Sequence, residues 1–170
     1  MSVRLEANTA GAPALSEVAV RSLEAADAPQ VAALFDRLSP RSLYLRFCSP
    51  IVKVSASTVR HLSNLDQRHE AVGAFDDGVL VGTAHFFRST QDSSQAEICV
   101  EVDDHHQGHG LGVCLLRQLA ALARDRGINC FTATALVENR AAIGLIRHLN
   151  WPIVTSVAGP ELNIAMALPA

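Results

Sequence analysis

The chain has 170 residues, about half of them apolar, which suits a single globular domain with a substantial core. A formal net charge of −3 argues against nucleic acid as a general partner and mildly favours cationic substrates. No apolar run approaches membrane-spanning length and no signal-peptide pattern opens the sequence, so we expect no membrane partner. The four cysteines are scattered without a CxxC pair, which argues against a zinc site or a disulfide framework and indicates the cytoplasm.

The first third of the chain predicts a tail, a strand and three helices. Residues 1–16 are rich in Ala, Gly, Ser, Thr and Pro, and we interpret them as a flexible tail ahead of one domain at 17–170. Alternating hydrophobicity predicts a strand over residues 17–23. Helices are expected at residues 27–38, at 41–47 after Ser39-Pro40, and after a cap at Ser55 or Ser57.

The rest of the chain predicts six strands and two further helices. Asp76-Asp77-Gly78 is a strong hairpin signal between strands at residues 71–75 and 79–87. A strand at 96–103 leads into a glycine turn and a long helix that ends at Arg126-Gly127. The remaining elements are a strand at 128–137, a helix at 139–149, and strands at 152–157 and 162–168, turned at Gly159-Pro160.

The turn between the 96–103 strand and the long helix carries three glycines at alternate positions, Gly108, Gly110 and Gly112. Glycine allows close approach of a ligand and positive φ, and the first amides of a helix are unpaired at its positive end. This combination binds phosphate or pyrophosphate. A P-loop needs Lys and Ser/Thr after the last glycine, where this chain has Val113 and Cys114, and a dinucleotide GxGxxG motif finds no third glycine.

A third template fits the turn. Gln107-Gly-His-Gly-Leu-Gly112 resembles the Gln/Arg-x-x-Gly-x-Gly/Ala loop with which GNAT (Gcn5-related) N-acetyltransferases bind the pyrophosphate of acyl-CoA. The order of predicted elements is similar to that family over nearly all of the chain. The resemblance implies an α+β (α/β) fold whose mixed, mostly antiparallel central sheet is flanked by helices, and it implies acetyl-CoA as the cofactor. The implied loop contacts are Gln107, Gly108, His109, Gly110, Leu111 and Gly112.

An earlier segment narrows the resemblance. Arg37-Leu38-Ser-Pro-Arg-Ser-Leu-Tyr-Leu-Arg-Phe47 carries a Leu-Ser-Pro-x-Ser-x-Tyr-x-Arg-Phe pattern that looks like a segment of bacterial protein lysine acetyltransferases of the Pat type. It implies that the acetyl group moves to a protein lysine, by direct attack of the amine in a ternary complex. A small-molecule amine is an alternative acceptor. A regulatory module that binds acyl-CoA without catalysis is an alternative function. The chain could also form a homodimer.

Carboxylates before the glycine turn are the candidate bases. Ala96-Glu97-Ile98 resembles the GNAT strand segment that carries the general base, so Glu97 is the first choice, against the alternative of a strand glutamate facing water. Glu101 shares the face of Glu97 if the strand is regular and is the weaker candidate. We interpret Asp103 and Asp104 as a solvated charge run. Backbone groups near Val100 and Val102 are implied to hold the pantetheine and polarise the thioester carbonyl.

Asn139 opens the 139–149 helix in an Asn-x-x-Ala-x-x-Leu segment whose asparagine contacts the cofactor in GNAT enzymes, although a plain helix N-cap is an equal alternative. Many of these enzymes carry a tyrosine acid seven residues later, where this chain has Ile146, and the only tyrosine is Tyr44. No metal is expected, because the four-residue spacing of His105 and His109 serves a metal only on a helix.

Overall fold

The computed structural model describes residues 3–4 and 18–169. One eight-stranded sheet runs through them in the order β1-β2-β3-β4-β5-β6-β8-β7. Every neighbouring pair is antiparallel except β5 (Gln95–Val102) and β6 (Cys130–Leu136), which are parallel. Helices flank this sheet, so the predicted α+β fold with a mixed, mostly antiparallel sheet is confirmed.

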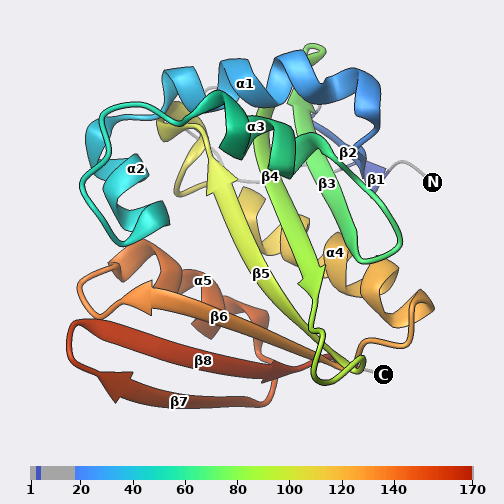
Figure 1. The fold of residues 1–170 in the computed structure, drawn as a ribbon, viewed down its shortest axis with the longest axis vertical. Helices are drawn as coiled ribbons and strands as arrows, with labels where there is room; N and C mark the ends of the chain where they lie inside the picture. The colour runs from blue at the N-terminus through green and yellow to red at the C-terminus, as the bar shows by residue number, and fades with distance from the viewer. Residues whose placement is uncertain (1–2, 5–17, 170) are drawn as a thin grey trace.

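The first half of the sheet is covered on both faces. Helices α1 (Ala28–Arg37) and α3 (Ala56–Ser63) pack on one face of β3 (His69–Asp76) and β4 (Val79–Arg88), where they form one hydrophobic cluster. Helix α4 (Leu111–Asp125) covers the opposite face with a second, larger cluster. Figure 1 shows the two helical layers on either side of the strands.

The second half of the sheet is covered on one face only. Helix α5 (Arg140–Leu149) packs beside α4 against the apolar side chains of β6 and β8 (Glu161–Ala167). The other face of β8 and of the edge strand β7 (Ile153–Ala158) has no described helix over it, and only α2 (Pro40–Phe47) comes near β6. This open face borders the site described below.

Local signals account for most element boundaries. Asp77 and Gly78 adopt φ of 47° and 78° at the β3–β4 turn, as an Asp-Gly hairpin turn requires. Ser39 caps α2 by accepting from the Ser42 amide, with Pro40 in the first helical position. Ser55, rather than Ser57, caps α3 by accepting from the Thr58 amide.

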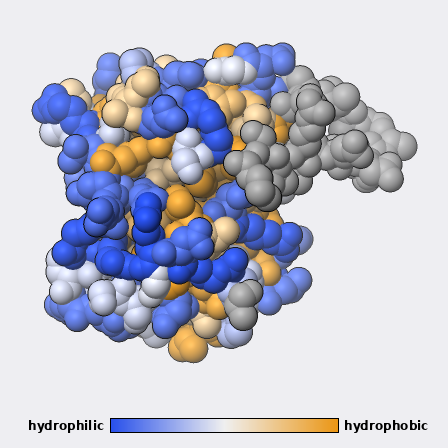
Figure 2. Space-filling model, turned by 90° about the vertical axis from the view of Figure 1, so that its right-hand side faces the viewer, coloured by the Kyte–Doolittle hydropathy of each residue, from blue (hydrophilic) through white to orange (hydrophobic). Residues whose placement is uncertain are grey.

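The N-terminus adds one element that the sequence did not predict. The two-residue strand β1 (Val3–Arg4) pairs with β2 (Ala19–Ser22) at the edge of the sheet. The rest of the predicted tail lies outside the described residues, and the domain boundary at residue 17 stays a prediction. No helix among residues 18–169 is long and apolar enough to cross a membrane. Most of the face shown in Figure 2 is hydrophilic, with hydrophobic residues visible in the seam between its upper and lower halves.

Candidate active site

The site is a cleft that opens where β5 and β6 separate. Their parallel pairing extends only from Gln95 opposite Cys130 to Glu97 opposite Thr132. Beyond Glu97 the two strands diverge, as Figure 1 shows, and a cleft of about 1070 Å³ lies between them. The cleft is lined by eight of the nine candidate cofactor-binding residues and by Glu97; only His109 does not line it.

The glycine loop contributes a row of unpaired amides to this cleft. Gly108 and Gly110 have φ of 79° and 80°, which strains any residue with a side chain. Gly110 is the N-cap of α4, and the first helical hydrogen bond runs from the Cys114 amide to the Gly110 carbonyl at 3.1 Å. Within the described part of the chain, the amides from 107 to 113 donate no hydrogen bond. Unpaired amides at the positive end of a 15-residue helix are an arrangement that favours anions.

Gly112 has a packing role instead. A Cβ at this position would lie 3.2 Å from a methyl carbon of Leu145 on α5. Glycine therefore lets α5 approach the first turn of α4 closely. This contact brings the start of α5 to the cleft, where Asn139 also lies. The Asn139 side chain caps α5 by accepting from the Ala142 amide at 3.0 Å, so the N-cap alternative for this residue is confirmed.

Backbone groups of β5 face the cleft beyond the point of separation. The Asp103 amide donates to the Val81 carbonyl on β4 at 2.8 Å. Because successive strand residues direct their backbone groups to opposite edges, those of Val100 and Val102 point away from β4, toward the cleft. The Val102 carbonyl accepts from the Gln107 side chain at 2.9 Å, so the loop is fastened to this edge of the strand.

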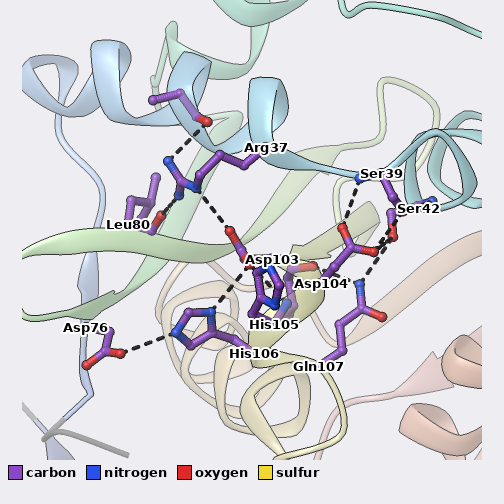
Figure 3. Close-up of polar contacts among 12 residues, drawn as sticks. Arg37, Ser39, Ser42, Asp76, Leu80, Asp103, Asp104, His105, His106 and Gln107 are labelled. Atoms are coloured by element: carbon purple, nitrogen blue, oxygen red, sulfur yellow. Dashed lines mark hydrogen bonds and ion pairs between the residues drawn. The ribbon is translucent and has the colours of Figure 1, made fainter.

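Asp104 ties the same loop to α2, as Figure 3 shows. One of its carboxylate oxygens accepts from the Ser39 amide at 2.9 Å, and the other accepts from the hydroxyls of Ser39 and Ser42 at 2.8 and 2.7 Å. The Gln107 side chain donates to the Ser42 hydroxyl at 3.3 Å. Burial favours a higher pKa for Asp104, but the donors from Ser39 and Ser42 outweigh it and lower the pKa.

Asp103 makes a second tie, between the loop and α1. It is 5% exposed and accepts from the Arg37 guanidinium and the His105 amide, both at 3.0 Å. Burial works to raise its pKa, and the bond from Arg37 reverses the direction and lowers it. The interpretation of Asp103 and Asp104 as a solvated charge run was wrong for Asp103, which is buried and paired with Arg37. Asp104 is exposed, as expected, although its carboxylate also accepts from Ser39 and Ser42 (Figure 3).

The two glutamates of β5 differ sharply in environment. Glu97 is exposed and lines both the cleft and an adjoining hollow of about 440 Å³. The Glu101 side chain is 1% exposed, forms an ion pair with Arg46 of α2, and accepts from the Thr83 hydroxyl at 2.8 Å. Burial favours a higher pKa for Glu101, but the Arg46 charge outweighs it and lowers the pKa. Glu101 is thus a structural partner of α2, and the interpretation of it as a reserve base is not supported by its geometry.

Sequence reasoning missed a pair of histidines behind the cleft wall. His69 Nε2 lies 3.1 Å from His85 Nδ1, and His69 Nδ1 lies 3.1 Å from the Asn64 carbonyl. Because a carbonyl only accepts, a neutral His69 donates from Nδ1 to the Asn64 carbonyl and accepts a hydrogen bond at Nε2 from His85 Nδ1. Burial lowers the pKa of His85 to about 4, so this imidazole is neutral near pH 7. Phe87 stacks on His69 at 4.1 Å and lines the cleft.

The cleft has no tyrosine at the position where the resemblance predicted an acid. Ile146 lines the cleft at the position where the resemblance predicted a tyrosine, while Tyr44 on α2 does not line it. Among the described residues, no three His, Cys, Asp or Glu side chains gather as metal ligands.

Comparisons with known proteins agree with this geometry. The family model described as Acetyltransferase (GNAT) family matches residues 38–151, more than half of the chain. Acetyltransferase Pat of Mycolicibacterium smegmatis is 30% identical over 106 residues, which are 61% of this chain and 32% of the relative. The aligned region thus spans about a third of that relative's length.

Two solved structures share the fold. The GNAT domain of S. lividans PAT has a TM-score of 0.85 and 25% identity, with 98% of this chain and 97% of that chain covered. The Salmonella typhimurium protein yncA, solved with its cofactor acetyl-CoA, has a TM-score of 0.72 and 20% identity, with 89% and 94% covered.

Proposed function

Because the chain belongs to the GNAT family of acetyltransferases, we propose that it transfers an acetyl group from acetyl-CoA to a primary amine beside Glu97. One observation carries the proposal. The loop with unpaired amides between Gln107 and Val113 lines a cleft that is also lined by the exposed Glu97. An anion site and a candidate base in one cleft are what an amine acetyltransferase needs.

In this proposal the glycine loop and the start of α4 bind the diphosphate of coenzyme A. Gln107, Gly108, His109, Gly110, Leu111 and Gly112 supply the loop, and the positive end of the helix favours the negative charge. Asn139 lies across the cleft at the start of α5 and contributes a contact to the cofactor. The pantetheine arm follows the β5 edge, where the backbone groups of Val100 and Val102 face the cleft.

Glu97 acts as the general base in the transfer. A lysine amine has a pKa of about 10.4, so near neutral pH it must lose a proton before it attacks. Glu97 takes that proton directly or through a water, the nitrogen bonds to the thioester carbon, and the carbon–sulfur bond then breaks. Cleft-facing amides of β5 stabilise the oxyanion between these steps. The thiolate has a pKa of about 8.5 and departs as the anion, which does not require a tyrosine at the position of Ile146.

The preferred acceptor is a protein lysine. The Leu38–Phe47 segment supports this choice, since it resembles Pat-type lysine acetyltransferases and its residues Leu45, Arg46 and Phe47 line the cleft. The relative named Pat supports it too, over the third of its length that aligns. The four cysteines are free thiols, which suits the reducing cytoplasm. Ile146 in the cleft favours a second candidate, a module that binds acyl-CoA without turnover.

An acceptor screen tests the proposal. The protein is incubated with acetyl-CoA and a panel of small amines and lysine peptides, and the release of the coenzyme A thiol is measured. An anti-acetyl-lysine blot detects the acetylation of protein acceptors. Thiol release that depends on an amine supports the transferase. Tight binding of coenzyme A without release for any amine supports the non-catalytic module instead.

A further inference from the structure

A polar trough runs along the open face of the sheet from Glu97 to Glu161. The strand register places Glu97 opposite Thr132 of β6, and Leu136 of β6 opposite Glu161 of β8. Thr134 and Asn163 form the pair between them and share a hydrogen bond of 3.3 Å. Because paired residues share a face and alternate residues along a strand return to it, these side chains all belong to the open face.

Uncharged polar groups line the floor of this trough. The hollow of about 440 Å³ next to Glu97 is bounded by the hydroxyl and amide side chains of Thr132, Thr134, Ser156 and Asn163, and by apolar residues that include Val154 and Ala165. Glu97 and Glu161 both line the larger cleft. Burial first, and the Glu161 carboxylate second, raise the pKa of Cys48, which places Glu161 close to the C-terminal end of α2. Helix α2 therefore approaches the trough near Glu161.

The charges around the trough leave both end carboxylates without a cation. Among residues 18–169, neither Glu97 nor Glu161 forms an ion pair. The arginines that α2 brings near are engaged, Arg46 with Glu101 and Arg41 with Glu138 at 3.1 Å. Arg140, at the start of α5, lines the larger cleft but not the hollow beside Glu97. A ligand in the trough therefore meets a carboxylate at each end, with Thr132, Thr134 and Asn163 among the groups between.

We propose that Glu161 binds a second positive charge on the amine acceptor, so that the preferred substrates carry two cations. This inference rests on the proposed function, in which Glu97 receives the reacting amine. Four residues of β6, about 13 Å along the strand, and two strand spacings, about 10 Å across the sheet, separate Glu97 from Glu161, so their backbones lie about 16 Å apart. Each glutamate side chain can cover part of this separation, and a long diamine, or a lysine peptide with a second basic residue about four positions away in an extended segment, can cover the rest.

Paired acceptors that differ only in the second charge test the inference on the full chain. We would measure kcat/KM for diaminooctane against octylamine, and for a lysine peptide with arginine four positions on against the same peptide with alanine. The acceptor with the second cation should be better by about two- to fivefold, the size of an exposed ion pair. Glu161→Gln should remove that preference by lowering kcat/KM for the acceptor that carries the second cation.

Two further variants sharpen the outcome. Asp77→Asn removes one negative charge at the distant β3–β4 turn and should keep the full preference, whereas Glu161→Lys should reverse it. A Glu161-dependent preference in either pair supports the inference, and the pair that shows it identifies the source of the second cation. Turnover without any preference, or a preference that persists in Glu161→Gln, overturns the inference and leaves the transferase intact. No turnover with any amine overturns the transferase and this inference together.

Discussion

Glu97 and Glu101 project from the same face of β5, but only Glu97 presents its carboxylate to solvent in the cleft. Four residues along the strand, Glu101 is enclosed with Arg46 and Thr83. The buried pair fixes α2 against β5, and α2 in turn lines the cleft beside Glu97. One glutamate therefore positions the wall of the site, and the other is available for chemistry.

Replacement of Glu97 tests its role as the base. Glu97→Gln keeps the size and hydrogen-bonding capacity of the side chain but cannot take the amine proton. We expect kcat to fall by about 10²- to 10³-fold, the usual contribution of a positioned base. Because the proposed mechanism assigns Glu97 to the acceptor amine and not to the cofactor, the affinity for coenzyme A measured by calorimetry should not change.

Glu138→Gln is the control for this variant, since Glu138 is an exposed carboxylate outside the cleft lining, paired with Arg41. It should retain wild-type kcat within about twofold, in line with the small contribution of exposed ion pairs. An unchanged kcat in Glu97→Gln would remove Glu97 from the mechanism, and the base would then have to be sought elsewhere in the cleft.

The glycine loop offers a matched pair of variants. Gly110 and Gly78 have nearly the same φ, 80° and 78°, and a Cβ at either one meets nothing within 4 Å. Aspartate at each position therefore imposes the same backbone strain. Only at Gly110 does it also place a negative charge at the unpaired amides of the cleft. Gly110→Asp should weaken coenzyme A binding by about 10- to 100-fold, the value of one or two charge-assisted hydrogen bonds, and Gly78→Asp should not.

Calorimetric titration with coenzyme A measures both affinities, and thermal unfolding should show that the two variants lose similar stability. Equal affinities in Gly110→Asp and Gly78→Asp would mean that the loop amides do not hold the diphosphate. The binding mode proposed above would then fail, whatever the activity of the chain.

Most of the fold could be predicted because its signals are local. The β3–β4 hairpin follows from Asp77-Gly78, and α2 follows from Ser39-Pro40. No short sequence pattern predicts that β8 lies between β6 and β7, or that β1 joins the edge of the sheet. These arrangements depend on pairings between distant strands, which no short pattern reports.

The parts of the site that prediction missed are also non-local. The burial of Asp103 and the hydrogen bonds of Asp104 were missed because their partners, Arg37 and Ser39, are more than 60 residues away. The histidine pair was hidden for a different reason. A register shift between Ala74 and Phe75 places His69 opposite Phe87, one residue from where a count from the hairpin turn would place it.

The carboxylate of Asp104 should keep α2 ordered against the glycine loop. Asp104→Ala removes the acceptor for the Ser39 amide and for the hydroxyls of Ser39 and Ser42. We expect faster amide hydrogen exchange in α2 and a loss of about 1–3 kcal/mol in the free energy of unfolding, the usual cost of partners left unsatisfied. The affinity for coenzyme A should fall several-fold, because Gln107 also contacts Ser42.

Asp92 provides the comparison for this variant. In the β4–β5 turn it likewise accepts from an amide and a hydroxyl of one serine, Ser94, and from the Gln95 side chain. Asp92→Ala should loosen its own turn and leave exchange in α2 and coenzyme A affinity unchanged. If exchange in α2 responds equally to both variants, the tie through Asp104 is not what orders that helix.

Finally, the buried histidine pair should make the folded state sensitive to acid. The pKa of His85 is about 4 in the folded chain, and a histidine in the unfolded chain has a pKa of about 6.5. Between these values the unfolded state binds more protons, so the free energy of unfolding falls as pH drops through this window. The titration of His85 should lower the free energy of unfolding only slightly at pH 7, and by about 2 kcal/mol more at pH 5. Urea unfolding at the two pH values measures the loss.

His85→Gln isolates this contribution, because a glutamine amide can still donate to His69 Nε2 but does not titrate. The variant should lose about 2 kcal/mol less than wild type between pH 7 and pH 5, whereas His148→Gln, at an exposed position in α5, should follow wild type. Burial also lowers the pKa of His69, so part of the acid sensitivity should remain in His85→Gln. The same loss in both variants would show that His85 does not stay neutral in the folded chain, and acid unfolding would then have to arise from other groups.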